Sequence, residues 1–212
     1  GMYQPVIETI AQYLPNEISL LDVGCGEGSF LNELSKLKKI QTAVGFDISK
    51  EGVYVATEQS VEAFWCVADL TNLPFADQTF NTILNIFSPS HYQEFQRVLS
   101  EDGEVLKVVP QENYLKELRQ AFYPNQPEKQ SYSNDRVVAK FTESMKLTER
   151  QRVTYEFEIP EENRKDLLAM SPLEWQVEEE IKADLYKNPL KKITIDIELL
   201  KGTKRKRFSS SF

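Results

Sequence analysis

The residues with the clearest chemical potential form a short glycine-rich loop, Asp22-Val23-Gly24-Cys25-Gly26-Glu27-Gly28. It follows an apolar run that reads as a buried strand, and it precedes a helical pattern. Glycines at such a junction let the backbone turn sharply and approach a ligand, while amides at the helix start face whatever is bound. Asp47 comes 21 residues after Gly26, at the end of the next expected strand. This spacing suits a carboxylate that accepts both hydroxyls of a ribose, so the pattern predicts a nucleoside-containing cofactor.

A nicotinamide dinucleotide and S-adenosylmethionine (SAM) would both use these features, so the neighbouring residues must decide between them. Asp22 lies at the approach to the loop, where a carboxylate would repel a pyrophosphate but attract a cationic amino acid. Asp69, just after the third expected strand, is placed to accept a hydrogen bond from an adenine amino group, with Leu70 and Ile48 flanking the ring. Taken alone, Asp69 reads better as a helix cap or a turn residue. Together these residues favour SAM.

The elements that position this loop alternate between helical and strand-like periods, as a parallel sheet with crossover helices requires. Apolar residues from Val6 to Leu14 predict a first helix. Strands are expected over 18–23, 43–46, 62–67, 80–87 and 104–109, and helices over 27–37, 50–59 and 92–99. The run from Phe80 to Phe87 suits a strand buried on both faces. The pattern predicts an α/β fold with a doubly wound, mostly parallel sheet.

After Pro110 the pattern loosens. We expect a helix over 114–122, a polar turn-rich stretch over 124–133, a strand over 153–159, a helix over 161–170 and a last strand from Ile193 to Leu199. The last two strands are expected to form an antiparallel edge. The segment from Lys201 to Arg207 carries five basic residues in seven and reads as a solvated tail. We expect one domain over 1–212, with an N-terminal helix in 1–17, a SAM-binding core in 18–110 and substrate-side elements in 111–212.

Composition and charge narrow the classes of function. The chain has 212 residues, enough for one domain with a single core, and 33 acidic against 25 basic residues give a formal charge of -8. That charge opposes a generic polyphosphate binder, so any nucleic-acid contact must be local. Cys25 and Cys66 are the two cysteines, and they predict neither a disulfide framework nor a zinc site. No apolar run suits a membrane span and no secretory signal opens the chain, so a cytoplasmic protein is expected.

Several motifs in the first half resemble those of the class I SAM-dependent methyltransferases. The resemblance covers residues 18 to 109 and rests on Asp22 to Gly28, Phe46-Asp47-Ile48, Ala68-Asp69, Leu73-Pro74-Phe75 and Asp102-Gly103. It implies that Gly24, Gly26 and Gly28 shape the methionine pocket, that Asp47 holds the ribose and that Asp69 holds the adenine edge. It also implies a seven-stranded Rossmann-like sheet of order 3-2-1-4-5-7-6, with strand seven antiparallel.

A narrower resemblance is to the guanine-N1 methyltransferases of large-subunit ribosomal RNA. It rests on Tyr3-Gln4-Pro5, Asn85-Ile86-Phe87-Ser88-Pro89, Val109-Pro110, Tyr114 to Leu118 and Met170 to Trp175. Members of that family carry an amino-terminal zinc module with four metal ligands, which this sequence lacks, and no other metal site is expected. The module recognises RNA, so its absence indicates either a truncated chain or a relative with another substrate. The match of Tyr3-Gln4-Pro5 to the family just beyond the module favours truncation slightly.

Methyl transfer mainly requires positioning and the exclusion of water, although the proton on guanine N1 must leave before or during attack. Asn85, Ser88 and the Pro89 backbone are the candidates to orient the base edge, with Asn85 also close to the cofactor, and Phe87 or Tyr92 could stack on an extruded base. Their alternative roles are core, turn and cap residues. His91, the single histidine, is expected at a helix start that Ser90 caps, without a catalytic role, and both cysteines are expected to be unreactive.

Three functions follow from these observations. The leading one is an RNA base methyltransferase, the second a SAM-dependent methyltransferase of a small molecule, and the third a SAM-fold domain that binds without catalysis. The complete set of cofactor residues argues against the third. Ribosomal RNA would have to bind through a bounded basic surface, for which the candidates are Lys116 with Arg119, Arg136 with Lys140, and the tail from Lys201. Monomer and homodimer both remain open.

Overall fold

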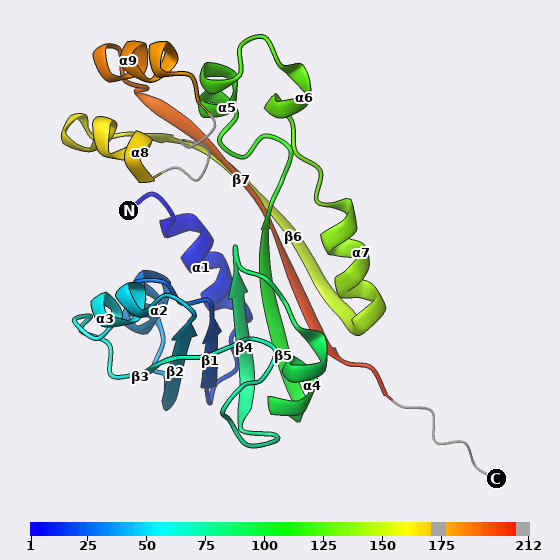
Figure 1. The fold of residues 1–212 in the computed structure, drawn as a ribbon. Coiled ribbons are helices and arrows are strands. Elements are labelled where there is room, and N and C mark those ends of the chain that lie inside the picture. Colours follow the sequence, from blue (N-terminus) through cyan, green and yellow to red (C-terminus); the bar gives the residue numbers. More distant parts are fainter. Residues whose placement is uncertain (171–176, 207–212) are drawn as a thin grey trace.

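The computed structural model describes residues 1–170 and 177–206, and a seven-stranded sheet runs through them (Figure 1). Its strand order is β3-β2-β1-β4-β5-β7-β6, as expected from the resemblance. The first five strands are parallel to one another, and β7 pairs antiparallel with both β5 and β6. The strands are β1 (Ser19–Val23), β2 (Thr42–Asp47), β3 (Phe64–Val67), β4 (Phe80–Ile86), β5 (Leu99–Pro110), β6 (Met145–Glu158) and β7 (Lys192–Lys204).

Helices cover both faces of this sheet, because successive residues of its buried strands point to opposite sides. On one face Leu20, Leu84 and Ile197 pack in a core with α1 and α2. On the other, Leu21 and Ile83 pack in a core with α4 and α7. The doubly wound α/β architecture expected from the sequence is therefore confirmed. The helices are α1 (Gln4–Tyr13), α2 (Ser29–Leu37), α3 (Lys50–Ala56), α4 (Tyr92–Val98), α5 (Lys116–Phe122), α6 (Pro127–Gln130), α7 (Asp135–Ser144), the 3-10 turn η1 (Glu161–Asn163), α8 (Arg164–Met170) and α9 (Glu179–Lys187).

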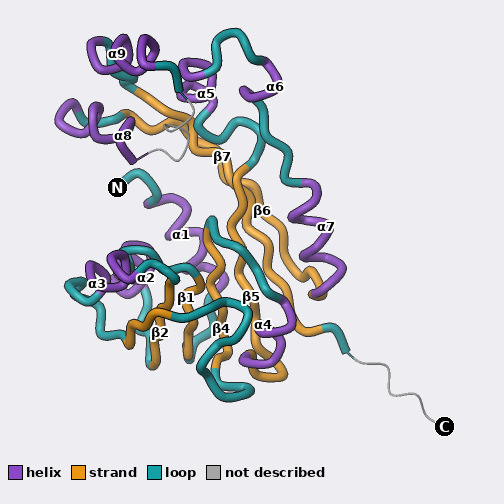
Figure 2. Tube along the Cα trace, viewed as in Figure 1, coloured by secondary structure: helices purple, strands orange, loops and turns teal. Residues whose placement is uncertain are grey.

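The C-terminal elements gather where β6 ends and β7 begins, at the top of the view (Figure 2). There α5 and α9 share a small apolar core that includes Leu118, Phe122 and Leu185. Sequence reasoning missed α7 and α9. Both helices are mostly polar, with Val138 and Phe141 as the buried residues of α7 and Leu185 as that of α9, so few apolar residues mark them in the sequence.

Two further expectations need correction. The stretch from Lys201 to Lys204 is not a solvated tail but the end of β7, where Lys201 pairs with Glu104 at 3.2 Å and Lys204 with Glu101 at 3.6 Å. The Asp102-Gly103 turn is instead part of β5, which begins directly after α4 and shifts its register against β4. The family motif from Ser171 to Trp175 and the tail beyond 206 lie outside the described residues.

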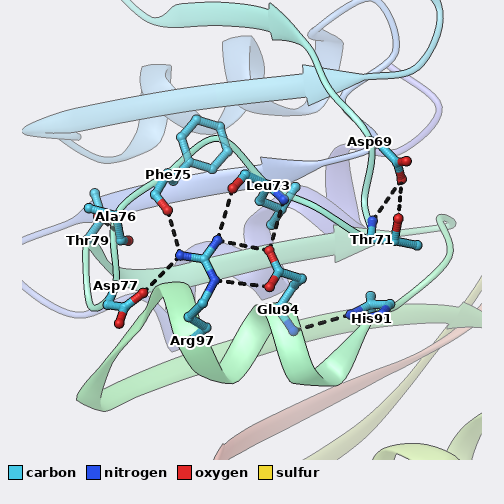
Figure 3. A network of polar contacts seen from close by, with 10 residues as sticks. All are labelled: Asp69, Thr71, Leu73, Phe75, Ala76, Asp77, Thr79, His91, Glu94 and Arg97. Carbon is cyan, nitrogen blue, oxygen red and sulfur yellow. Dashed lines mark hydrogen bonds and ion pairs between the residues drawn. The ribbon is translucent and has the colours of Figure 1, made fainter.

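The loop between β3 and β4 is tied to α4 through Glu94 and Arg97, which pair with each other within the helix, and Arg97 also pairs with Asp77 of the loop at 3.0 Å (Figure 3). The Arg97 guanidinium donates two hydrogen bonds to Glu94, at 3.0 and 2.9 Å, and others to the carbonyl oxygens of Leu73 and Phe75. The Glu94 carboxylate in turn accepts from the Leu73 amide at 2.9 Å. These bonds fix the irregular segment after Asp69, which contains Leu73 and Phe75, on α4.

We expect Glu94→Gln to lower the free energy of unfolding at pH 7 by about 1–3 kcal/mol, because it replaces charged hydrogen bonds with neutral ones and sets an amide group against Arg97. The hydrogen bonds from Arg97 lower the pKa of Glu94. Their contribution is therefore complete above the unfolded carboxyl pKa of about 4.3 and is lost as the pH falls through the lower folded value. Urea unfolding at pH 7 and in the acid range measures this. The control Glu101→Gln, on an exposed carboxylate, should change little.

Candidate functional site

The glycine loop turns at the carboxyl end of β1 through three left-handed residues. Gly24, Gly26 and Gly28 have φ values of 66°, 52° and 76°, a region that side chains other than glycine rarely occupy. A Cβ atom built on Gly24 would lie 2.7 Å from the Ser88 Cβ, and one on Gly28 would lie 2.7 Å from the Trp65 ring. A Cβ on Gly26 would meet nothing within 4 Å. The middle of the loop thus borders open space while its two ends are packed.

Asp47 joins this loop to the end of β2. Its carboxylate accepts hydrogen bonds from the Gly26 amide at 2.9 Å and from the Ser49 amide at 2.9 Å. The side chain is half-buried, so it can still accept further hydrogen bonds from a ligand. Ile48, the next residue, is 80% exposed at the same edge of the sheet. An apolar side chain this exposed beside a polar loop is a suitable wall for an aromatic ring.

Asp22 is a buried carboxylate directly before the loop. Burial raises the pKa of Asp22 to about 7, and repulsion by the Asp47 carboxylate adds to the effect. No hydrogen bond reaches its side chain from any of the described residues. A cationic ligand group nearby would favour the ionised form, which agrees with the charge argument made from the sequence.

Asp69 lies in the loop after β3, exposed to solvent. Its carboxylate accepts from the Thr71 amide at 2.9 Å and from the Thr71 hydroxyl at 2.8 Å (Figure 3), and these bonds lower the pKa of Asp69. The turn role that the sequence left open is therefore present. Its second carboxylate oxygen makes neither of these bonds, so a ligand contact is compatible with the turn. Leu70, the following residue, packs partly into the core.

Asn85, near the end of β4, holds the loop that follows this strand through hydrogen bonds from its buried side chain. Its side chain is fully buried, and its amide group donates to the Ser88 hydroxyl at 2.7 Å and to the Pro89 carbonyl at 2.9 Å. The Ser88 hydroxyl donates to the Val23 carbonyl at 2.7 Å, which joins this loop to β1 beside Gly24. We therefore propose that Asn85 positions the Ser88-Pro89 turn rather than contacting a substrate.

Sequence reasoning missed Lys107, a buried cation on β5. Its ammonium group donates to Asn85 Oδ1 at 2.6 Å, to the Ser90 hydroxyl at 2.7 Å and to the Ser88 carbonyl at 3.3 Å. Burial lowers the pKa of Lys107 to about 8. A lysine within the apolar run 105–109 of an internal strand was the available signal, because such a charge is rarely buried without partners.

A cavity of about 490 Å³ opens beyond Ser88. Phe87 forms part of its wall, stacked on Tyr114 with ring centroids 5.4 Å apart. Tyr92, by contrast, cannot serve as an exposed stacking platform, because it is buried against Phe95 and Phe141 in the core. The other lining residues are Ser88, Pro89, Lys107, Val108, Val109, Pro110, Arg119, Tyr132 and Val137.

His91 and the cysteines have structural environments. His91 itself is the N-cap of α4 and accepts from the Glu94 amide at 3.3 Å, whereas Ser90, expected as the cap, bonds to Asn85 and Lys107 instead. Burial raises the pKa of the Cys25 thiol to about 12, which opposes formation of a nucleophilic thiolate.

Comparisons with known proteins identify the family to which this chain belongs. A model of the methyltransferase domain matches residues 21–108. The YxjB protein of Bacillus subtilis, provisionally named a 23S rRNA (guanine-N(1)-)-methyltransferase, is 36% identical over 213 residues, which cover 96% of this chain and 75% of that protein. This chain belongs to the class I SAM-dependent methyltransferases. It is also 32% identical over 127 residues to the 23S rRNA (guanine(748)-N(1))-methyltransferase of Streptomyces fradiae, covering 56% of this chain and 45% of that enzyme.

Solved structures agree with the fold of this chain. The YcgJ protein of Bacillus subtilis superposes with a TM-score of 0.61 at 20% identity, over 95% of this chain and 98% of that one. A SAM-dependent methyltransferase of Methanosarcina mazei gives a TM-score of 0.59 at 17% identity, over 94% and 98% of the two chains.

SAM is thus the cofactor of this methyltransferase, and the glycine loop fits it. The open space at Gly26, the carboxylates of Asp22 and Asp47 and the exposed Ile48 lie at one edge of the sheet, where nucleotide cofactors bind in open α/β folds. We propose that Asp22 and the loop from Gly24 to Gly28 face the methionine part of SAM. For the adenosine part we propose Asp47, Ile48, Asp69 and Leu70.

We expect Asp47→Asn to weaken SAM binding by about 1–3 kcal/mol, the loss typical of a hydrogen bond to a charged group. Asp69→Ala should weaken it less, because water can replace an exposed carboxylate. Isothermal titration of both variants measures the difference. Unchanged affinity in a folded Asp47→Asn protein would remove Asp47 from the site.

Proposed function

We propose that this SAM-dependent methyltransferase methylates N1 of guanine in large-subunit ribosomal RNA. The observation that carries the proposal is the 36% identity to the Bacillus subtilis relative across 96% of this chain. That match extends well beyond the cofactor half, into the C-terminal elements around the cavity. A ribosomal substrate also supports a cytoplasmic location, which we propose with it.

The cavity beyond Ser88 supports an aromatic acceptor. Its volume of about 490 Å³ falls within the range of about 300–1,000 Å³ usual for small-molecule sites. Enzymes that modify a base extrude it from its stack and hold it against aromatic side chains. Phe87 and Tyr114 offer such a surface, and Phe87 remains 36% exposed. A base on this surface would lie next to the glycine loop, because Ser88 both lines the cavity and packs on Gly24.

The residues of the chain would act mainly by positioning. SAM supplies a methyl group on a positively charged sulfur. Lys107 and Asn85 hold the Ser88-Pro89 turn, and this turn together with the Phe87-Tyr114 pair would orient the base. None of the residues assigned here removes the N1 proton directly, so we propose that it passes to solvent.

Charge supports a small-molecule acceptor as the second candidate. The formal charge of -8 repels RNA, and two of the basic residues considered for RNA contact, Lys201 and Lys204, are paired with carboxylates. Any RNA surface must therefore rest on a few remaining cations, and RNA binding should fall steeply with salt concentration.

The experiment that separates the two candidates is tritium transfer from labelled SAM to unmodified 23S rRNA, followed by nucleoside analysis. We expect label in 1-methylguanosine. A second arm fuses the four-ligand zinc module of the ribosomal RNA family in front of Tyr3 and should transfer faster, because the module adds RNA affinity. If SAM binds but neither arm yields methylated guanosine, the RNA proposal fails and a small-molecule acceptor replaces it.

A further inference from the structure

Two cationic side chains line the cavity beyond Ser88, and their hydrogen bonding differs. The three N–H groups of Lys107 have three acceptors in Asn85, Ser88 and Ser90, so none is left for a ligand. The Arg119 guanidinium has no ion pair and no hydrogen bond with any residue in 1–170 or 177–206. Its Nε atom is buried and without an acceptor. Of the two cations, Arg119 is therefore the one whose donors can reach a molecule in the cavity.

Tyr132, which also lines the cavity, contacts the Arg119 guanidinium without accepting a hydrogen bond from it. Arg119 lies on α5, and its guanidinium is placed over the Tyr132 ring, 5.4 Å from the ring centroid. Burial lowers the pKa of Arg119, yet an arginine keeps its charge in proteins. A buried donor without a partner is unfavourable, and such groups in native proteins call for an explanation. Nε itself has no accessible surface, but the terminal nitrogens of the same guanidinium are not enclosed in this way, and they can donate to an acceptor oxygen that a ligand brings into the cavity.

We propose that Arg119 donates a hydrogen bond to the O6 oxygen of the acceptor guanine and stabilises the negative charge that develops there when N1 loses its proton. This inference rests on the proposed function. In the step, the N1–H bond breaks and its proton goes to solvent, while its electron pair is shared with O6. N1 then forms a bond to the methyl carbon, and the carbon–sulfur bond breaks with its electron pair left on sulfur. Anionic guanine and cationic sulfonium thus become neutral 1-methylguanine and a neutral thioether.

The same contact selects the base. Guanine presents the O6 acceptor at the position where adenine presents an amino donor, which would oppose the donors of a guanidinium. A fixed donor that finds no acceptor in the wrong substrate discriminates more strongly than an apolar pocket does. Arg119 would therefore contribute to both specificity and rate.

The test is the pH dependence of kcat for transfer to unmodified 23S rRNA in wild type, Arg119→Gln and Arg119→Lys. A positive charge within hydrogen-bonding distance lowers the pKa of a group that becomes anionic by about 1–3 units. Loss of the Arg119 charge should therefore raise the apparent pKa of the rising limb, which reports the N1 proton, by at least about one unit. We expect Arg119→Gln to lower kcat at pH 7 about 10- to 100-fold and to recover as the pH rises. Arg119→Lys should keep the position of the wild-type limb, because it keeps the charge.

Two binding measurements and one control complete the design. The Kd for SAM should stay within about twofold, and the Kd for the RNA should rise only slightly, since one base contact adds little to binding dominated by phosphates. The control Lys187→Gln removes an exposed cation on α9, outside the cavity, and should leave the profile unchanged. Arg119→Met, which keeps the apolar stem, is the second variant if Gln disturbs the fold.

The outcomes are distinct. A wild-type enzyme that methylates guanine, with Arg119→Gln showing the wild-type pH profile or an equal loss at every pH, would overturn the role of Arg119 and leave the proposed function intact. An equal shift in Arg119→Lys would show that charge is not the cause and would also overturn it. If the wild type methylates no guanine while it binds SAM, the proposed function fails and this assignment fails with it.

Discussion

The site depends on one constraint, the left-handed turn that ends β1. It is built from three glycines at positive φ, of which Gly26 borders open space, while both ends of the turn are closed by packing against Ser88 and Trp65. The turn is also fastened to its neighbours, since Asp47 accepts from the Gly26 amide and Ser88 donates to the Val23 carbonyl. Loops after β1, β2 and β4 are therefore held to one another at a single edge of the sheet, and a shift in any of them would move the other two.

Behind this edge, a buried hydrogen-bond network lies between the glycine loop and the cavity beyond Ser88. Lys107 and Asn85 form a closed hydrogen-bond network whose acceptors come from the turn that follows β4. Buried charges of this kind are stable only when their partners are complete, which makes the network intolerant of rearrangement. The front of the turn faces the cavity, where the rings of Phe87 and Tyr114 stack. Positioning, rather than acid–base chemistry, is thus what the chain itself can contribute to methyl transfer.

The elements that could be predicted are those in which the spacing of apolar residues and the turn residues at either end indicate the same structure. The five parallel strands were found because each is an apolar run, and their order followed from the motif resemblance. By contrast, α7 and α9 are mostly polar helices that few apolar residues mark in the sequence. The lysines at 201 and 204 hid the end of β7 because their partners, Glu104 and Glu101, are distant in sequence. In the site, the glycines and Asp47 could be predicted from local spacing. The hydrogen-bond partners of Lys107 and the burial of Tyr92 could not, because both depend on which residues of other elements face them. The cofactor roles of individual residues and the single-domain organisation stay predictions.

We infer that the turn after β1 creates a SAM site and not a dinucleotide site. Isothermal titration of the protein with SAM, with its demethylated product and with NAD tests this directly. All three ligands contain adenosine, but NAD carries a pyrophosphate where SAM and its product carry an amino acid. A cationic amino acid part complements the buried carboxylate, whereas a pyrophosphate is repelled by it. We predict one-to-one binding of SAM and of its product, with no measurable binding of NAD. Tight binding of NAD without binding of SAM would contradict it.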